Sequence, residues 1–261
     1  MAAHAGDMAV SHDGSTLYVI DTTNFRIVPV NLDTHAVGAP IQLAYQAFYL
    51  EYARTDGTGL VISGNGQIFN AATRAAYAPT FSGGYYGSVV VSAARNGTRL
   101  CTIDTGLSPY SIACYALDTT SANGGQLLLG TAAFGAFGVG SNGRDVAVNA
   151  DGTRAYAASG APYEFDVYDT ASMAVVQILP GSNYPNAVEV AADGRIFAGT
   201  QDYYDPVDVW VYNAGGTQLA TYHVGGYAAP MLDHQLKVSG DGLRMITLTS
   251  VPALVFTTVG P

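Results

Sequence analysis

Short apolar runs alternate with turn-forming pairs along the whole chain. Six Asp-Gly or Asn-Gly pairs separate these runs, and they begin at Asp13, Asp56, Asn96, Asp151, Asp193 and Asp241. Such pairs favour tight hairpin turns, because both central residues of a type I′ turn need positive φ. The runs before and after each pair therefore predict two antiparallel strands. No window carries apolar residues at the spacing of an amphipathic helix without Gly, Pro or β-type runs interrupting it.

The turns recur at intervals of 40 to 55 residues. A period of about 40–45 residues is typical of a four-stranded propeller blade. Further apolar runs at 27–34, 165–170 and 207–213 fit third strands, and runs at 39–43, 175–179 and 218–222 fit fourth strands. One such sheet cannot bury both of its faces alone, whereas stacking around an axis covers them. We predict an all-β chain, a β-propeller of about six four-stranded blades in one domain over residues 1–261.

The predicted repeats are uneven. They span 7–44, 48–82, 87–131, 144–181, 186–225 and 234–261. The last repeat offers only two strands after its turn, at 244–249 and 253–259, and an incomplete blade leaves an unpaired edge. Either this blade has three strands, or the chain is part of a longer, seven-bladed polypeptide; we favour the second explanation.

Two segments carry a resemblance to a known repeat. Val-Ser-His-Asp-Gly-Ser-Thr-Leu-Tyr-Val (10–19) and Val-Asn-Ala-Asp-Gly-Thr-Arg-Ala-Tyr-Ala (148–157) resemble the YVTN repeat of bacterial surface propellers, as does Tyr-Asp-Thr-Ala-Ser (168–172) followed by Val-Val. The likeness covers most of the chain and is strongest in repeats one, four and five. It implies a WD40-like propeller in a secreted, periplasmic or cell-surface protein, and it implies little about function.

Charge and hydropathy narrow the range of partners. The formal net charge is −10, and Lys237 is the only lysine. Nucleic acids and anionic membrane surfaces attract clustered Lys and Arg, which this chain lacks. No apolar run approaches the roughly 20 residues that span a bilayer. The first residues lack the basic and apolar regions of a signal peptide.

The two cysteines face each other on a predicted hairpin. Cys101 and Cys114 lie in the runs 99–104 and 111–116, which place them on opposite strands. Opposite Cβ atoms lie about 4.5–5.5 Å apart, which permits a disulfide. The alternative is a pair of small buried thiols. A disulfide would indicate an oxidising, extracytoplasmic compartment.

Tyrosines gather in the connections on the rim opposite the Asp-Gly turns. Hairpin loops usually contain Gly, Asn, Asp and Ser, so tyrosines in these loops indicate a role other than turn formation. Tyrosine joins a rigid apolar face to a hydroxyl, which suits contacts with protein or carbohydrate. The alternative is that these rings pack over blade junctions. The candidate binding residues are Tyr49, Tyr85, Tyr86, Tyr110, Tyr163, Tyr184, Tyr203, Tyr204 and Tyr227.

Metal and nucleotide signals are sparse. Asp202, Asp205 and Asp208 form an acidic cluster whose oxygens would suit calcium, although solvated loop carboxylates are the alternative. The five histidines show no metal-ligand spacing. The Gly-x-Gly-x-x-Gly run at 138–143 precedes a predicted strand, whereas a dinucleotide site needs a helix there. Apart from calcium, no cofactor is expected.

These features favour a non-enzymatic, extracytoplasmic binding or scaffold module whose ligand is a protein or a glycan. The first alternative is a propeller hydrolase of lactonase type with a metal bound in the central channel. Glu189 and Lys237 occupy corresponding places in their repeats, so both can face that channel. The second alternative is a purely structural segment of a larger surface protein, since one fold serves many functions.

Overall fold

A computed structural model describes residues 4–77, 89–105, 109–117, 141–181, 183–201, 206–225, 228–251 and 253–260. Every helix or strand assigned within these residues is a β-strand, and the strands form six antiparallel sheets. None of the described residues belongs to a helix that is long and apolar enough to cross a bilayer.

The six sheets follow one another along the chain, and we number them as blades 1 to 6. Blade 1 holds β1 (Ala5–Val10), β2 (Thr16–Asp21), β3 (Arg26–Asn31) and β4 (Ile41–Gln42). Blade 2 holds β5 (Leu50–Thr55), β6 (Thr58–Ser63) and β7 (Ile68–Asn70), and blade 3 holds β8 (Val89–Ala93), β9 (Arg99–Asp104) and β10 (Ile112–Ala116).

The second half of the chain continues the same plan. Blade 4 holds β11 (Ser141–Val148), β12 (Arg154–Ala161), β13 (Glu164–Asp169) and β14 (Val175–Pro180). Blade 5 holds β15 (Pro185–Val190), β16 (Ile196–Thr200), β17 (Val209–Tyr212) and β18 (Gln218–Tyr222). Blade 6 holds β19 (Met231–Val238), β20 (Arg244–Thr249) and β21 (Leu254–Thr258), so it shows three strands among the described residues.

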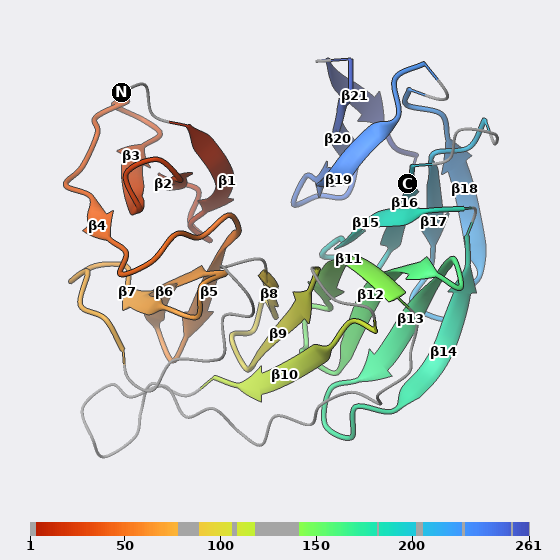
Figure 1. The fold of residues 1–261 in the computed structure, drawn as a ribbon, viewed down its shortest axis with the longest axis horizontal. Helices are drawn as coiled ribbons and strands as arrows, with labels where there is room; N and C mark the ends of the chain where they lie inside the picture. Colours follow the sequence, from red (N-terminus) through yellow and green to blue (C-terminus); the bar gives the residue numbers. More distant parts are fainter. Residues whose placement is uncertain are drawn as a thin grey trace.

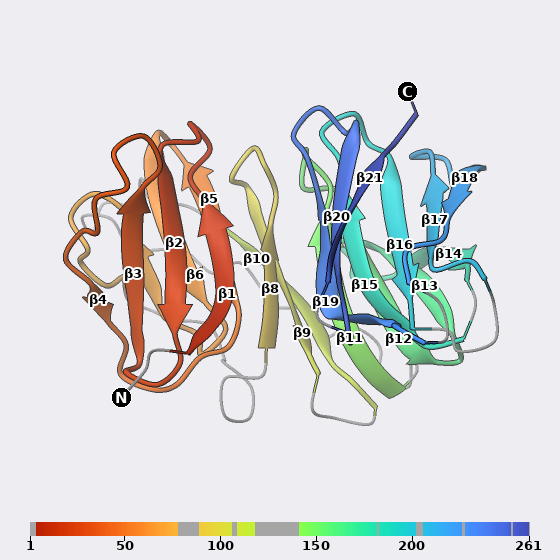
Figure 2. The ribbon, with the colours of Figure 1, turned by 90° about the horizontal axis from the view of Figure 1, so that it is seen from above.

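The blades stand radially, with their first strands nearest the centre (Figure 1). Seen from above in Figure 2, the strands run roughly along one common direction. This arrangement confirms the predicted β-propeller of about six blades. Blades 1, 4 and 5 have the expected four strands, whereas three strands are described in blades 2, 3 and 6.

Apolar clusters fill the junctions between consecutive blades. Five clusters of buried residues are present, and each draws its members from two neighbouring sheets. Between blades 4 and 5, for example, Phe165 and Leu179 pack with Ile196 and Tyr212. Since each sheet is too thin to hide its own faces, this stacking is what buries the core.

The six Asp-Gly and Asn-Gly turns form where predicted, with positive φ at each glycine. Only the turn at Asp56-Gly57 has positive φ at both positions, which the predicted type I′ geometry requires. The other five differ because the Asp or Asn side chain accepts a backbone N–H two residues later, as Asp13 Oδ1 does from Ser15 at 3.0 Å. This contact defines an Asx turn, which needs the left-handed conformation at glycine alone.

Cys101 on β9 and Cys114 on β10 are direct cross-strand partners, and a disulfide joins them. Both side chains are buried in the cluster between blades 3 and 4. The bond therefore ties two strands of one blade together inside its packed interface.

Candidate functional site

Four of the six inner strands are irregular near their first residues. The pairing register shifts between Ala5 and Met8 in β1, between Gly143 and Asp145 in β11, between Pro185 and Ala187 in β15, and between Met231 and Leu236 in β19. A β-bulge bends its strand and re-aims the side chains within it. These bulges set the positions of the polar residues described below, at the end of the ring away from the Asp-Gly turns.

A buried imidazole joins three blades at this end. His234 Nδ1 lies 2.5 Å from Asp145 Oδ1, and Nε2 lies 3.5 Å from Asp7 Oδ2. These residues come from β19, β11 and β1, so the contacts cross the centre of the ring. The side chains of His234 and Asp145 are only 7% and 2% exposed, which makes this pair the most shielded ion pair in the described residues.

Both carboxylates also accept backbone N–H groups from the next blade. Asp145 Oδ2 accepts from Val188 at 2.9 Å, and Asp7 Oδ2 accepts from Leu50 at 2.9 Å. Each aspartate lies six residues before the Asp of the following Asp-Gly turn, so the two hold equivalent places in repeats one and four. Their shared role is to clamp one inner strand to its neighbour.

The charges in this cluster favour one another. Burial is the largest single influence on the pKa of His234 and lowers it, but the charge and hydrogen bond of Asp145, with the contact to Asp7, together raise that pKa to about 10. Burial likewise opposes the charge on Asp7, yet contact with His234 holds its pKa below the usual value. The cluster therefore carries an imidazolium between two carboxylates at neutral pH. The ring of Tyr49 meets that of His234 edge-on, with centroids 5.3 Å apart.

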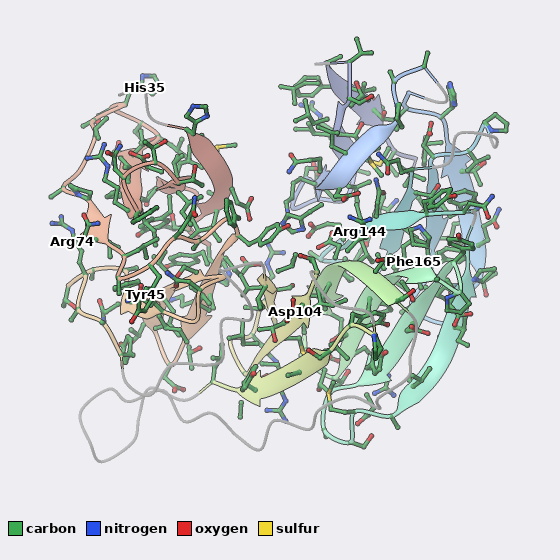
Figure 3. The ribbon with its side chains drawn as sticks, in the orientation of Figure 1. His35, Tyr45, Arg74, Asp104, Arg144 and Phe165 are labelled. Carbon is green, nitrogen blue, oxygen red and sulfur yellow. A yellow bond between two sulfur atoms is a disulfide. The ribbon has the colours of Figure 1, made fainter. Side chains whose placement is uncertain are left out.

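A surface pocket of about 140 Å³ lies directly beside this cluster, between blades 4, 5 and 6. Arg144 and Asp233, the sequence neighbours of Asp145 and His234, both line it and form an ion pair at 2.8 Å. Figure 3 shows Arg144 near the middle of the ring. We call this cavity the rim pocket; its other polar or aromatic lining residues are Asn142, Tyr163, Tyr184, Asn186 and Gln201.

Three residues that line the rim pocket have backbone conformations that L side chains seldom adopt. The φ angles of Asn142, Tyr163 and Tyr184 are 57°, 73° and 58°. A left-handed conformation is uncommon for a bulky residue, and such outliers concentrate at functional sites. The two tyrosine rings meet edge to face with centroids 5.2 Å apart, and the two residues are 39% and 44% exposed.

One residue that lines the rim pocket, Asn186, has a buried side-chain oxygen with no hydrogen-bond partner among the described residues. Asn186 is 1% exposed, and its amide nitrogen donates to the backbone carbonyl of Met231 at 2.8 Å. Its Oδ1 atom accepts no hydrogen bond from any described residue. Buried side-chain oxygens are nearly always satisfied, so this oxygen is an exception among the residues that line the pocket.

A second cavity, of about 210 Å³, occupies the channel end nearer the Asp-Gly turns. Glu51 and Glu189 line it, and Glu189 Oε2 lies 3.4 Å from Lys237 Nζ. Burial raises the pKa of Glu51 to about 7, while the nearby Lys237 opposes that shift. No group of three or more His, Cys, Asp or Glu side chains in the described part of the chain is arranged to hold a metal ion.

The tyrosines proposed from the sequence separate into three groups. Tyr163 and Tyr184 contact each other at the rim pocket. Tyr49 packs against the buried ring of His234, next to the pocket residue Asp233 in sequence. Tyr110 lies instead in the core, 5% exposed, and its hydroxyl donates to Asp166 Oδ2 at 2.8 Å. Its ring is therefore unavailable at the rim, because it packs at the junction of blades 3 and 4. The rest lie outside the described residues: Tyr85, Tyr86, Tyr203, Tyr204 and Tyr227.

The proposed acidic cluster is only partly described. Asp202 and Asp205 lie outside the described residues. Asp208 is fully buried, and its Oδ2 atom accepts N–H groups from Val224 at 2.7 Å and Gly225 at 3.2 Å. This carboxylate anchors the connection that follows β18, which is a structural role rather than an open ligand position.

No protein-family model matches this chain, and no curated protein matches it. Among solved structures, a chain of Kuenenia stuttgartiensis hydrazine synthase is 16% identical with a TM-score of 0.69, covering 93% of this chain and 73% of that one. A chain of a mitotic checkpoint complex is 14% identical with a TM-score of 0.68, covering 98% and 75%. Both are propeller-type folds, and at such low identity they support the fold alone.

Proposed function

We propose that this propeller is a non-enzymatic, extracytoplasmic binding module that takes a saccharide at the rim pocket. The observation that carries the proposal is the left-handed backbone that Asn142, Tyr163 and Tyr184 share around the rim pocket, since such conformations concentrate at functional sites. Sugar hydroxyls both donate and accept hydrogen bonds, so they can bind the polar side chains of the pocket lining.

The rest of the lining supports the same ligand class. Asn142 and Gln201 offer amide groups, and Arg144 with Asp233 offers a fixed donor and acceptor pair. Tyr163 and Tyr184 add aromatic faces with hydroxyls, which suit the apolar and polar sides of a sugar ring. The Cys101–Cys114 disulfide supports the extracytoplasmic location, because such bonds persist in oxidising compartments.

The test is a glycan array followed by calorimetric titration of the best ligand. We expect Tyr184→Ala and Gln201→Ala each to weaken binding about tenfold, which corresponds to about 1.4 kcal/mol. Tyr45→Ala is the matched control, because Tyr45 is 71% exposed and does not line the pocket. Figure 3 places it among the first two blades, far from Arg144 in that view.

Two results would reject the proposal. If no glycan binds the native chain, the result favours the alternative that this chain is a purely structural segment of a larger surface protein. If a glycan binds but Tyr184→Ala and Tyr45→Ala behave alike, the ligand lies elsewhere on the propeller. Melting temperatures of all variants must match the native value before affinities are compared.

A further inference from the structure

The 210 Å³ cavity beside the Asp-Gly turns lies on the axis of the ring, and we call it the channel cavity. The first strands of the blades stand nearest the centre (Figure 1), and every one of them lines this cavity. Their contributions include Val10, Glu51, Ser92, Ala147, Glu189 and Val238. Drug-sized ligands occupy pockets of about 300–1,000 Å³, so a ligand of the channel cavity must be smaller.

Basic groups gather at the end of the channel cavity beside the turns. His12 and Arg95 line it, and each directly precedes the Asp or Asn of its turn. Burial lowers the pKa of His12, and the nearby charges of Arg95 and Arg54 lower it further. Neither arginine forms an ion pair with a described residue. In a chain of formal net charge −10, two such arginines beside one cavity favour an anionic group there.

Carboxylates lie deeper in the same cavity. Glu189 and Glu51 precede the Asp of their turns by four and five residues, which places their backbones roughly 10–13 Å farther along the channel than Arg95. Glu189 already has a cation, since its Oε2 atom lies 3.4 Å from Lys237 Nζ. By contrast, the side chain of Glu51 makes one hydrogen bond with the described residues, in which Oε1 accepts the N–H of Tyr52 at 2.8 Å. A carboxylate has about four acceptor positions, so Glu51 can accept further donors from the cavity.

We propose that the channel cavity binds a small zwitterion whose carboxylate and ammonium lie at opposite ends of the molecule, as in an ω-amino acid. The guanidinium of Arg95 binds the carboxylate, because its fork of N–H donors matches two carboxylate oxygens. The ammonium donates to Glu51 at the deeper end. Between the two charged ends, Val10, Ala147 and Val238 offer an apolar wall to the methylene chain.

This proposal is independent of the saccharide site, because the channel cavity and the rim pocket lie at opposite ends of the ring and share no lining residue. Calorimetric titration at pH 7.5 with four probes tests it. Three probes share a six-carbon chain: 6-aminohexanoate carries both charges, hexanoate only the anion and hexylammonium only the cation. Glycine carries both charges on adjacent atoms. We expect 6-aminohexanoate to bind at least tenfold more tightly than each of the other three.

Two variants assign the ends of the ligand. Arg95→Gln should weaken binding of 6-aminohexanoate at least tenfold by removing the partner of the carboxylate. Glu51→Gln should weaken it as much by removing the partner of the ammonium. Arg244→Gln is the matched control, because Arg244 is an exposed arginine without a described ion pair that does not line the channel cavity. It should bind as the native chain does, and melting temperatures check that each variant is folded.

The native chain offers a second measurement that needs no variant. Only three glutamates exist, and Glu51 and Glu189 line the channel cavity whereas Glu164 does not. With ¹³C-labelled glutamate, 6-aminohexanoate should shift the Glu51 and Glu189 carboxyl signals and leave the Glu164 signal in place. Burial raises the pKa of Glu51 to about 7, and a bound ammonium should lower its titration midpoint because it favours the charged form.

Three outcomes would overturn the proposal. One is no detectable binding of 6-aminohexanoate to the native chain. Another is equal affinity for the three six-carbon probes, which would show that the cavity does not read both charges. The third is a Glu51 signal that stays in place at saturating 6-aminohexanoate, which would show that the zwitterion binds elsewhere. None of these outcomes bears on glycan binding at the rim pocket, which has its own variants.

Discussion

His234 in blade 6 lies 2.5 Å from Asp145 in blade 4, so one buried ion pair connects two sheets that are not neighbours in the ring. Asp145 also accepts the backbone N–H of Val188 in blade 5, which lies between them. Three successive blades thus meet at a single carboxylate. Because Arg144 and Asp233 flank this pair in sequence, the same cluster fixes one wall of the rim pocket.

Replacing His234 should destabilise the protein strongly. A His234→Gln variant leaves Asp145 buried without its cation, and breaking a buried ion pair costs about 3–5 kcal/mol. Urea unfolding at pH 6 measures the loss. Asp33→Asn, on an exposed turn of blade 1, is the control for removal of one charged group and should change stability little.

The pH dependence gives a sharper check on the same pair. In the folded protein the pKa of His234 is about 10, above the ordinary value of 6.5. The contribution of charged His234 to the free energy of unfolding is therefore complete below pH 6.5 and is lost as the pH rises through 10. The stability difference between native chain and His234→Gln should therefore shrink from pH 6 to pH 10. A difference that stays constant over this range would contradict a charged His234.

Local sequence chemistry explains how much of the fold was predictable. The glycine of each Asp-Gly turn adopts positive φ regardless of what surrounds it, so turn positions and the two strands beside them follow from short segments. Cys101 and Cys114 could be paired for the same reason, since one hairpin fixes their register. Blade count and radial order then follow from the period of the repeat.

The site was harder to predict because its residues meet only when the ring forms. Asp7, Asp145, Asn186 and His234 lie in or beside bulges, and no periodicity of the sequence marks a bulge. A signal existed for two of them, since Asp7 and Asp145 occupy equivalent repeat positions. The same reasoning from repeat positions predicts that Glu189 and Lys237 both face the channel. The sequence predicts Tyr110 at the rim, whereas its hydroxyl binds Asp166 in the core, and no feature of the sequence indicates that contact.

Removing the hydroxyl of Tyr110 should destabilise the protein in a pH-dependent way. Burial raises the pKa of Asp166 to about 6, and the hydrogen bond from Tyr110 opposes this shift. In Tyr110→Phe the pKa of Asp166 rises further, and the buried carboxylate loses its donor at a cost of about 1–3 kcal/mol. Thermal unfolding at several pH values measures the change.

The sign follows from the raised pKa of Asp166. The pKa of Asp166 in the folded protein exceeds the ordinary value of 3.8. The contribution of Asp166 to the free energy of unfolding is therefore most favourable below pH 3.8 and declines as the pH rises through 6. The loss in Tyr110→Phe should therefore be larger at pH 7.5 than at pH 5. Tyr168→Phe is the matched control, because the Tyr168 hydroxyl lies 3.2 Å from that of Tyr110 and makes no described bond to Asp166. Equal pH profiles for the two variants would argue against this account.

Removing the disulfide should lower stability without changing the fold. The bond closes a loop with a sequence separation of 13 residues, which corresponds to about 3 kcal/mol in the chain-entropy treatment. For a chain of this length, the melting temperature of the Cys101→Ala/Cys114→Ala variant should fall by about 6–12 °C. Scanning calorimetry with and without reductant gives the check. The reductant should affect the native chain alone, and an equal effect on the double variant would point to another cause.

Glu51 should titrate near neutral pH, and Lys237 should control where it does so. Burial raises the pKa of Glu51 to about 7, with the Lys237 ammonium partly opposing the shift. The chain has only three glutamates, Glu51, Glu164 and Glu189, so selective ¹³C labelling of glutamate gives three side-chain carboxyl signals to follow. In Lys237→Met the Glu51 signal should titrate above pH 7, because the positive charge that lowers its pKa is gone. Lys237→Arg keeps the charge and should leave the titration near its native midpoint. Two results would contradict this account: a Glu51 titration midpoint near 4.5 in the native chain, or a midpoint that is unchanged in Lys237→Met. Either would show that water in the channel screens the charges of Glu51 and Lys237 from each other.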